Sequence, residues 1–477
     1  MSVGRSAGPL PAGSPARRCR ADLLFVALAT LLAFVALLLS AQEARAGVRD
    51  DFEAPRTDNW LRLGSFYVQP AVTIKNIGID SNVYLTPVNP SRAYTATLGA
   101  TGRGAIRFGS RAFVTLNAMG EYVWFSTPSP APVQPAGSGS LAELSHPNYG
   151  AGVKGNLNLR KLRLFAAEDY ARYQERPTVE VNERPNIRHH IERGGVGYES
   201  SSRSAIDTIV TRETIDYSAS SYTYYTSCLL DGTVYRSGPY GIDDYFSRTE
   251  TTGTLRFSQM ITGRTRLILD GSLRSYDFAT GLQPNNPCGG IPVVGAGRNA
   301  KETRVTTGVE ILPGGTLVGS ARIGLSDFRP EYIASQKTRE PVGAIMLNWR
   351  LGSRISLLTA YDRDLYFSFV ADNIYFMQDH AALQGVYYFN RLVGVEAGYD
   401  RYWLDYPTEE IVQQGNSPVT LVKRQADVKI LGAGVRLRLA DKTSVALRVS
   451  RRQRSSNIPG SLADNQVLFS TSVETTF

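Results

Sequence analysis

The sequence is poor in cysteine, contains only one long apolar run and has no block of basic residues. Only three cysteines occur among 477 residues. Cys19 lies in a segment that we expect to be removed, so Cys228 and Cys288 are the pair that could form a disulfide in an oxidising compartment, with two unpaired thiols as the alternative. After residue 46 no stretch without charges is long enough to cross a bilayer as a helix. Any membrane crossing beyond that point must use strands.

The charge is spread along the chain. Lysine and arginine number 52 against 43 acidic residues, a formal charge of +9, and they form no run. Proteins that bind nucleic acid gather basic residues on one face, so the sequence argues against a nucleic-acid partner. The mean hydropathy of -0.19 is that of a soluble-looking chain, but a barrel strand shows lipid only at every second side chain and keeps the mean equally low.

The N-terminal segment has the order of an export signal. Arg17 and Arg18 precede an apolar run at 23–39, and Ala44-Arg45-Ala46 offers a cleavage site of small residues. We expect residues 1–46 to be a signal peptide that is removed on export through the periplasm. An uncleaved membrane anchor is the alternative, because the apolar run is close to spanning length.

From residue 65 onward, apolar and polar residues alternate with a period of two. Val445, Leu447 and Val449 fall on one face of a strand, and Ser444 and Arg448 fall on the other. A helix would mix these faces. The pattern predicts strands at 65–79, 93–108, 111–125, 147–160, 162–173, 189–201, 204–218, 247–261, 265–278, 302–312, 316–328, 341–351, 355–367, 375–389, 392–405, 422–440, 443–454 and 464–477.

The connections between these strands alternate between tight and long. Gly109-Ser110 and Gly352-Ser353 are typical hairpin turns, whereas 126–146 and 279–301 are long and polar. This asymmetry predicts an all-β fold, a closed antiparallel transmembrane β-barrel of about 18 strands with short periplasmic turns and long outer loops. The predicted organisation is a signal peptide at 1–46, a short periplasmic N-terminal segment at 47–64 and the barrel at 65–477.

The last strand carries an expected assembly signal. Val467, Phe469, Val473 and Phe477 share one face. Outer-membrane barrels commonly end in an aromatic residue that the barrel assembly machinery recognises, so we expect Phe477 to have that role.

The stretch Ser65–Tyr84 resembles the opening strand of a family of outer-membrane β-barrel porins often encoded with exopolysaccharide gene clusters. The resemblance is carried by Asp80-Ser81-Asn82-Val83-Tyr84. It implies a single-chain barrel that passes polysaccharide or small solutes. From their chemistry alone, Asp80, Ser81 and Asn82 are turn formers that end the first strand.

Other motifs give no support for chemistry. Gly150, Gly152 and Gly155 match a nucleotide-binding glycine pattern, but they lie between two predicted strands instead of opening a helix. His189 and His190 are neighbours on a strand and point to opposite faces, so they cannot readily share a metal ion. A hydrolase would need a serine close to a histidine, but Ser200–Ser202 lie at the other end of the strand that holds these histidines. We therefore expect no enzyme activity, no metal and no cofactor.

The candidate functional residues are charged positions predicted to face away from lipid and to line a lumen. They are Arg266, Asp270, Arg274, Arg304, Glu310, Arg322, Glu396, Asp400, Arg436, Arg438 and Arg448. Arginine outnumbers the acids, which favours a weak anion preference or the binding of acidic sugar chains. The alternative is that arginines and acids brace the wall in pairs and close the lumen.

Together these features predict an outer-membrane pore for passive diffusion of small solutes or for export of polysaccharide. Its expected partners are outer-membrane lipid, the assembly machinery and polysaccharide or small anionic solutes. The tyrosine-rich loop 219–246 is the predicted gate or sugar contact. A plugged structural or adhesive barrel that binds a partner through its outer loops is the rival interpretation.

Overall fold

The structure is a computed structural model. It describes residues 52, 57, 60–85, 89–128, 144–182, 184–218, 224–230, 233–279, 295–369, 373–412, 420–440, 443–458 and 464–476.

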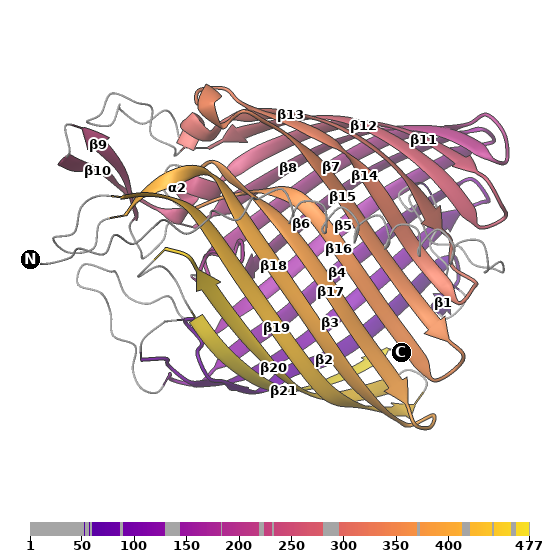
Figure 1. Ribbon diagram of the computed structural model, residues 1–477. Helices are drawn as coiled ribbons and strands as arrows, with labels where there is room; N and C mark the ends of the chain where they lie inside the picture. The colour runs from indigo at the N-terminus through magenta and orange to yellow at the C-terminus, as the bar shows by residue number, and fades with distance from the viewer. Residues whose placement is uncertain are drawn as a thin grey trace, which may run out of the picture.

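Eighteen strands of the described chain form one closed antiparallel sheet (Figure 1). They are β2 (Phe66–Asp80), β3 (Ala93–Phe108), β4 (Ala112–Phe125), β5 (His146–Leu159), β6 (Leu162–Gln174), β7 (Asn186–Glu199), β8 (Ser204–Tyr217), β11 (Arg248–Met260), β12 (Thr265–Phe278), β13 (Ala300–Ile311), β14 (Leu317–Pro330), β15 (Thr338–Leu351), β16 (Ile355–Phe367), β17 (Tyr375–Tyr388), β18 (Val393–Val412), β19 (Thr420–Ala440), β20 (Thr443–Ser456) and β21 (Asp464–Thr476).

Each strand pairs with the next along the chain, and β8 pairs with β11. The final strand β21 pairs with β2, from Ala71 opposite Thr476 to Asp80 opposite Leu468, so the sheet closes. Closure leaves none of these strands with an unpaired edge. The predicted barrel and its strand number are confirmed.

Smaller elements occupy the two ends of the barrel (Figure 1). The hairpin β9 (Tyr224–Leu230) and β10 (Thr233–Tyr240) and the helix α2 (Ile242–Phe246) lie at the end with the long connections, which we call the loop end. The strand β1 (Leu61–Leu63) pairs with β2 at the opposite end, the turn end. Two short 3-10 helices, Gly295–Arg298 and Ala334–Gln336, complete the described elements.

Part of the segment between the predicted strands 392–405 and 422–440 is strand in the structure. The ladder between β18 and β19 continues past an irregularity at Asp405–Glu409 and ends with Val412 opposite Thr420. β18 therefore runs past the predicted strand end at 405 to Val412, and β19 begins at Thr420, before the predicted start at 422, because the antiparallel backbone pairing continues.

The alternation of side chains gives the barrel two different faces. On β12, Leu269 and Leu273 point outward and are 48% and 65% exposed, whereas Asp270 and Tyr276 point inward and are buried. Residues directly opposite each other on antiparallel strands share a face, so this division continues around the sheet. Within the described residues, no helix is long and apolar enough to cross a membrane.

Candidate functional site

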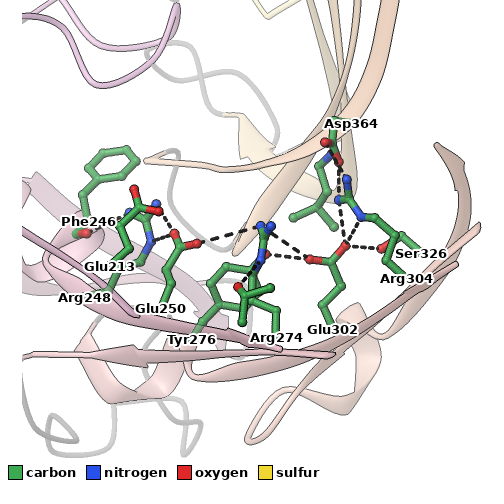
Figure 2. A network of polar contacts seen from close by, with 12 residues as sticks. Glu213, Phe246, Arg248, Glu250, Arg274, Tyr276, Glu302, Arg304, Ser326 and Asp364 are labelled. Atoms are coloured by element: carbon green, nitrogen blue, oxygen red, sulfur yellow. Dashed lines mark hydrogen bonds and ion pairs between the residues drawn. The ribbon is translucent and has the colours of Figure 1, made fainter. Parts of the chain in front are cut away.

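A chain of ion pairs runs along the inward face of β11, β12 and β13 (Figure 2). Arg248 binds Glu250 at 2.7 Å, and Arg274 lies between Glu250 at 3.8 Å and Glu302 at 3.9 Å. Each charge has a partner of opposite sign on its own or the neighbouring strand. Such pairing is what lets carboxylates and guanidinium groups remain ionised away from bulk water.

The chain continues from Glu302 to β16. Arg304 contacts Glu302 at 2.7 Å and Asp364 at 2.5 Å. Glu302 is 3% exposed, and it accepts hydrogen bonds from the Tyr276 hydroxyl at 2.7 Å and the Ser326 hydroxyl at 2.6 Å. The carboxylate is therefore held by two cations and two hydroxyls, as a buried charge requires.

Two further sets of pairs lie on the same strands. Asp270 receives Arg256 at 2.6 Å and Arg322 at 3.2 Å, and Arg266 contacts Glu310 at 3.3 Å. Together with the chain just described, these pairs define the braced wall, which consists of the inward charged residues of β11–β14 and β16.

The inward face of β18–β20 is different. Arg436 binds Glu396 at 2.7 Å, and the Arg438 guanidinium lies 4.9 Å from the centre of the Tyr388 ring. Arg448 forms no ion pair within the described part of the chain. We call Glu396, Arg436, Arg438 and Arg448 the arginine wall.

Arg448 extends over neighbouring strands that carry glycine. A Cβ atom at Gly432 would lie 3.0 Å from the Arg448 Nε and Nη2 atoms, and one at Gly398 would lie 3.4 Å from Nη2. Side chains at these two positions would crowd the guanidinium. The absence of side chains there leaves room for the guanidinium against the inner surface of the sheet.

Between the two walls, His380 lies among acidic and aromatic groups. It contacts Asp362 at 2.8 Å and Asp400 at 3.6 Å, and its ring stacks on Tyr402 at 4.2 Å. Among the described residues, no group of three His, Cys, Asp or Glu is disposed to hold a metal ion.

Residues 175–182, which we call the strap, cross the loop end from β6 to the strands on the opposite side. Glu180 accepts hydrogen bonds from the Ser368 hydroxyl at 2.9 Å and the Phe369 amide at 3.0 Å, both after β16, and from the Tyr406 hydroxyl on β18. Arg454 on β20 donates to the carbonyl of Glu180 at 2.8 Å. These contacts join parts of the chain that lie on opposite sides of the closed sheet.

The strap is also fixed along its length. Arg454 donates to the Asn182 side chain at 2.7 Å, Asn182 donates to the carbonyl of Leu85 at 2.8 Å, and Arg176 donates to the carbonyl of Val83 at 2.9 Å. Val181 is fully buried in an apolar cluster with residues of α2, β12, β14, β16 and β17. The strap is thus a packed crossbar, and it narrows the loop end.

Burial changes the ionisation of Glu180. Loss of hydration raises the pKa of this carboxyl above its ordinary value of 4.5, against the opposing effect of the hydroxyl and amide donors. The nearby Arg298 guanidinium is also fully buried, which lowers its pKa to about 9.

Two N-terminal residues, Phe52 and Thr57, contact the inner surface near the turn end. Phe52 is 1% exposed and meets Phe165 edge-on, with ring centroids 4.8 Å apart. Thr57 accepts a hydrogen bond from Arg107 at 3.0 Å. Phe52 and Thr57 of the predicted segment 47–64 therefore lie against the inner wall, whereas Leu61–Leu63 pair with β2 in the sheet.

The structure pairs several of the predicted lumen residues with one another, as in Arg266–Glu310, Arg322–Asp270 and Arg436–Glu396, and it gives four of them partners outside the predicted set. Arg274 and Arg304 meet Glu302, Asp270 meets Arg256, and Asp400 meets His380. The same period of two could have identified these partners. Their pairing depends on the register between strands, and the lining of an open lumen stays a prediction for the whole set.

Several predicted features lie outside the described residues. They are the signal peptide, Phe477 and Cys288. Cys228 lies in β9, opposite Tyr235 of β10, so the proposed disulfide stays a prediction. The predicted gate, 219–246, holds the β9–β10 hairpin and α2, whose Ile242, Tyr245 and Phe246 join the apolar cluster with Val181.

No family model and no curated protein matches this sequence. Among solved structures, the chain is similar to Pseudomonas aeruginosa OpdK with vanillate, at 10% identity and a TM-score of 0.43, over 86% of this chain and 98% of that one. It is also similar to Acinetobacter baumannii OccAB3, at 10% identity and a TM-score of 0.43, over 86% and 99%. The siderophore receptor PirA of P. aeruginosa follows at 7% identity and 0.39, over 86% and 80%. Likenesses this distant carry no argument about function.

Proposed function

We propose that the protein is an outer-membrane channel through which small solutes, preferentially anions, diffuse passively. The observation that carries this proposal is a closed barrel whose outward face is apolar and whose inward face is charged and polar. In hydrocarbon every backbone donor and acceptor needs a partner, and a closed sheet supplies it. A charged and polar inner face is compatible with a water-filled lumen.

The strap supports small solutes over polymers. Its hydrogen bonds to β18, β20 and the segment after β16 hold it across the loop end. A polysaccharide chain would have to pass beside this crossbar or displace it. Polymers, whose passage the family resemblance implies, are therefore the less favoured class of substrate.

The preference for anions rests on the arginine wall. On the braced wall the charges are paired, but on the arginine wall Glu396 binds Arg436, and Arg438 and Arg448 form no ion pair within the described residues. A surplus of one sign inside a low-dielectric wall raises the local concentration of ions of the other sign.

Liposome swelling with sugars of graded size tests the channel directly. We expect entry of monosaccharides and exclusion of long oligosaccharides. Equal exclusion of all sugars would support a plugged barrel instead, and equal entry of long oligosaccharides would favour the polymer pathway.

The route to the membrane belongs to the same proposal. We infer export through the periplasm, removal of residues 1–46 and recognition of Phe477 by the barrel assembly machinery. N-terminal sequencing of the protein from outer membranes should begin at Gly47, and a start at Met1 would contradict the cleavage.

A further inference from the structure

On the outward face, charged residues interrupt the apolar surface of β6, β7 and β8. Glu168 lies directly opposite Glu192, and Glu192 lies directly opposite Arg212. Glu168 and Glu192 each lie six residues from the loop end of their strands, whereas Leu273 on β12 faces outward at five residues from that end. These carboxylates are thus at least as deep along the barrel as residues that are leucine elsewhere.

The four charged or ionisable groups of this region are well exposed. Glu168 contacts His190 at 3.0 Å with side-chain exposures of 63% and 37%, and Glu192 contacts Arg212 at 3.8 Å with exposures of 50% and 61%. Charged side chains on the lipid face of a barrel are unfavourable in a depth-dependent way. Since the proposed function places this face in a membrane, the exposed groups would need a polar environment that acyl chains do not provide.

The residues in the next row toward the turn end have small side chains. Gly155, Ala166, Gly194, Val210 and Gly253 lie opposite one another across five strands. A Cβ atom at Gly155 or Gly253 would meet nothing within 4 Å, and one at Gly194 would only touch the Phe165 carbonyl at 3.8 Å. The packing of this chain therefore gives no reason for glycine at these positions.

An inward glycine shows the contrast. At Gly152 an added Cβ would run into the side chains of Asp169 and Asn117. Glycine inside a strand weakens it, and it is found where another backbone or a ligand approaches closely. On the outward row, the open space leaves room for the surface of another molecule.

The charged row and the small row together line a hollow of about 500 Å³. Its walls include Val153, Ala166, Glu168, Glu192, Gly194 and Arg212. The hollow thus combines positions where another molecule can approach the backbone closely with side chains of both signs of charge.

We propose that a second copy of this chain docks on the outward face of β5–β8 and β11, which we call the small-residue face. The charge pattern favours a copy of the chain over a lipid headgroup. A phosphate would require an excess of cations, but here two carboxylates accompany one arginine and one histidine. A second copy brings the same set of both signs, so Arg212 of one copy can neutralise Glu168 or Glu192 of the other.

The inference rests on the proposed membrane location, and its test uses the full-length mature barrel in lipid nanodiscs and in mild detergent. Light scattering coupled to size-exclusion chromatography gives the mass. We expect more than one copy for the wild type. We expect Gly194→Leu to release single copies because the added side chain keeps the partner away.

Gly385→Leu is the matched control. Gly385 also faces outward, on β17 far from the small-residue face, and an added Cβ would meet the Leu357 side chain at an ordinary 3.6 Å. It should keep the wild-type mass. Arg212→Glu should also give single copies, and the exchange Glu192→Arg with Arg212→Glu should restore association.

A single-copy mass for the wild type in native-lipid nanodiscs would overturn the inference, as would association that both Gly194→Leu and Arg212→Glu leave intact. A bound lipid that is retained by the single-copy wild type and lost in Arg212→Glu would assign the face to lipid and also overturn it. Conductance is measured on the same samples. A conducting single copy rejects only the docking, and an associated barrel that neither conducts nor admits sugars rejects only the channel.

Discussion

On the braced wall each arginine described above lies against a carboxylate, whereas among the three arginines of the arginine wall only Arg436 does so in the described chain, against Glu396. Both walls come from the same alternation of strand residues. The difference lies in what the guanidinium groups contact: carboxylates on the braced wall, and mainly an aromatic ring and a glycine surface on the arginine wall. The first arrangement holds the barrel together, and the second leaves positive charge available to a solute.

The largest expected effect breaks the braced wall. Arg304→Ala leaves Glu302 and Asp364 without their shared cation, and we expect it to lower the free energy of unfolding by about 3 kcal/mol. Arg448→Ala removes an arginine that has no ion pair in the described chain, and it should cost less than about 1 kcal/mol. Urea unfolding in lipid vesicles measures both, and equal losses would erase the distinction between the walls.

Removing the strap tests whether the strap limits the conductance independently of the two walls. Replacement of residues 176–182 by a short Gly-Ser linker should raise single-channel conductance roughly two-fold or more, because the constriction is lost. The anion preference should persist, since the arginine wall is unchanged. Unchanged conductance would mean that the strap does not limit flow.

Neutralising the arginine wall should alter selectivity without altering the fold. In Arg436→Gln, Arg438→Gln and Arg448→Gln combined, we expect the anion-to-cation permeability ratio to fall roughly two-fold or more. Arg329→Gln is the control, because Arg329 lies on the outward face beside Asp327. A ratio unaffected in the triple variant would place selectivity elsewhere.

The smallest expected effect is a dependence of strap docking on pH. The pKa of Glu180 is raised in the docked strap by burial, so docking favours the neutral carboxyl. That contribution is full below the ordinary pKa of 4.5 and is lost as the pH rises through the raised value. Limited proteolysis of the strap should therefore speed up from acid to neutral pH. Glu180→Gln stays neutral and should abolish the trend, and a trend that persists in this variant would assign it to another group.

The sequence predicted the fold well because the alternation of apolar and polar residues, with a period of two, recurs in every strand. On β12 it placed Arg266, Asp270 and Arg274 on one face, and the structure shows them together on the inward side. A local pattern cannot show which charges meet. Arg304 and Asp364 lie on β13 and β16, three strands apart, and their contact depends on barrel closure and register.

The strap shows the same limit more strongly. Its residues read as an ordinary polar connection, and nothing near Glu180 in the sequence indicates Tyr406, 226 residues away. Likewise, alternation predicts that Glu168 and Glu192 face outward, but their juxtaposition follows only from the pairing of β6 with β7.

The central claim is a water-filled channel whose surplus of arginine attracts anions. The most direct test is the reversal potential of the wild-type barrel in a planar bilayer under a potassium chloride gradient. The account predicts open-channel conductance with a reversal potential of the sign for chloride preference. A cation-selective potential, or a membrane that the inserted barrel leaves insulating, would contradict it.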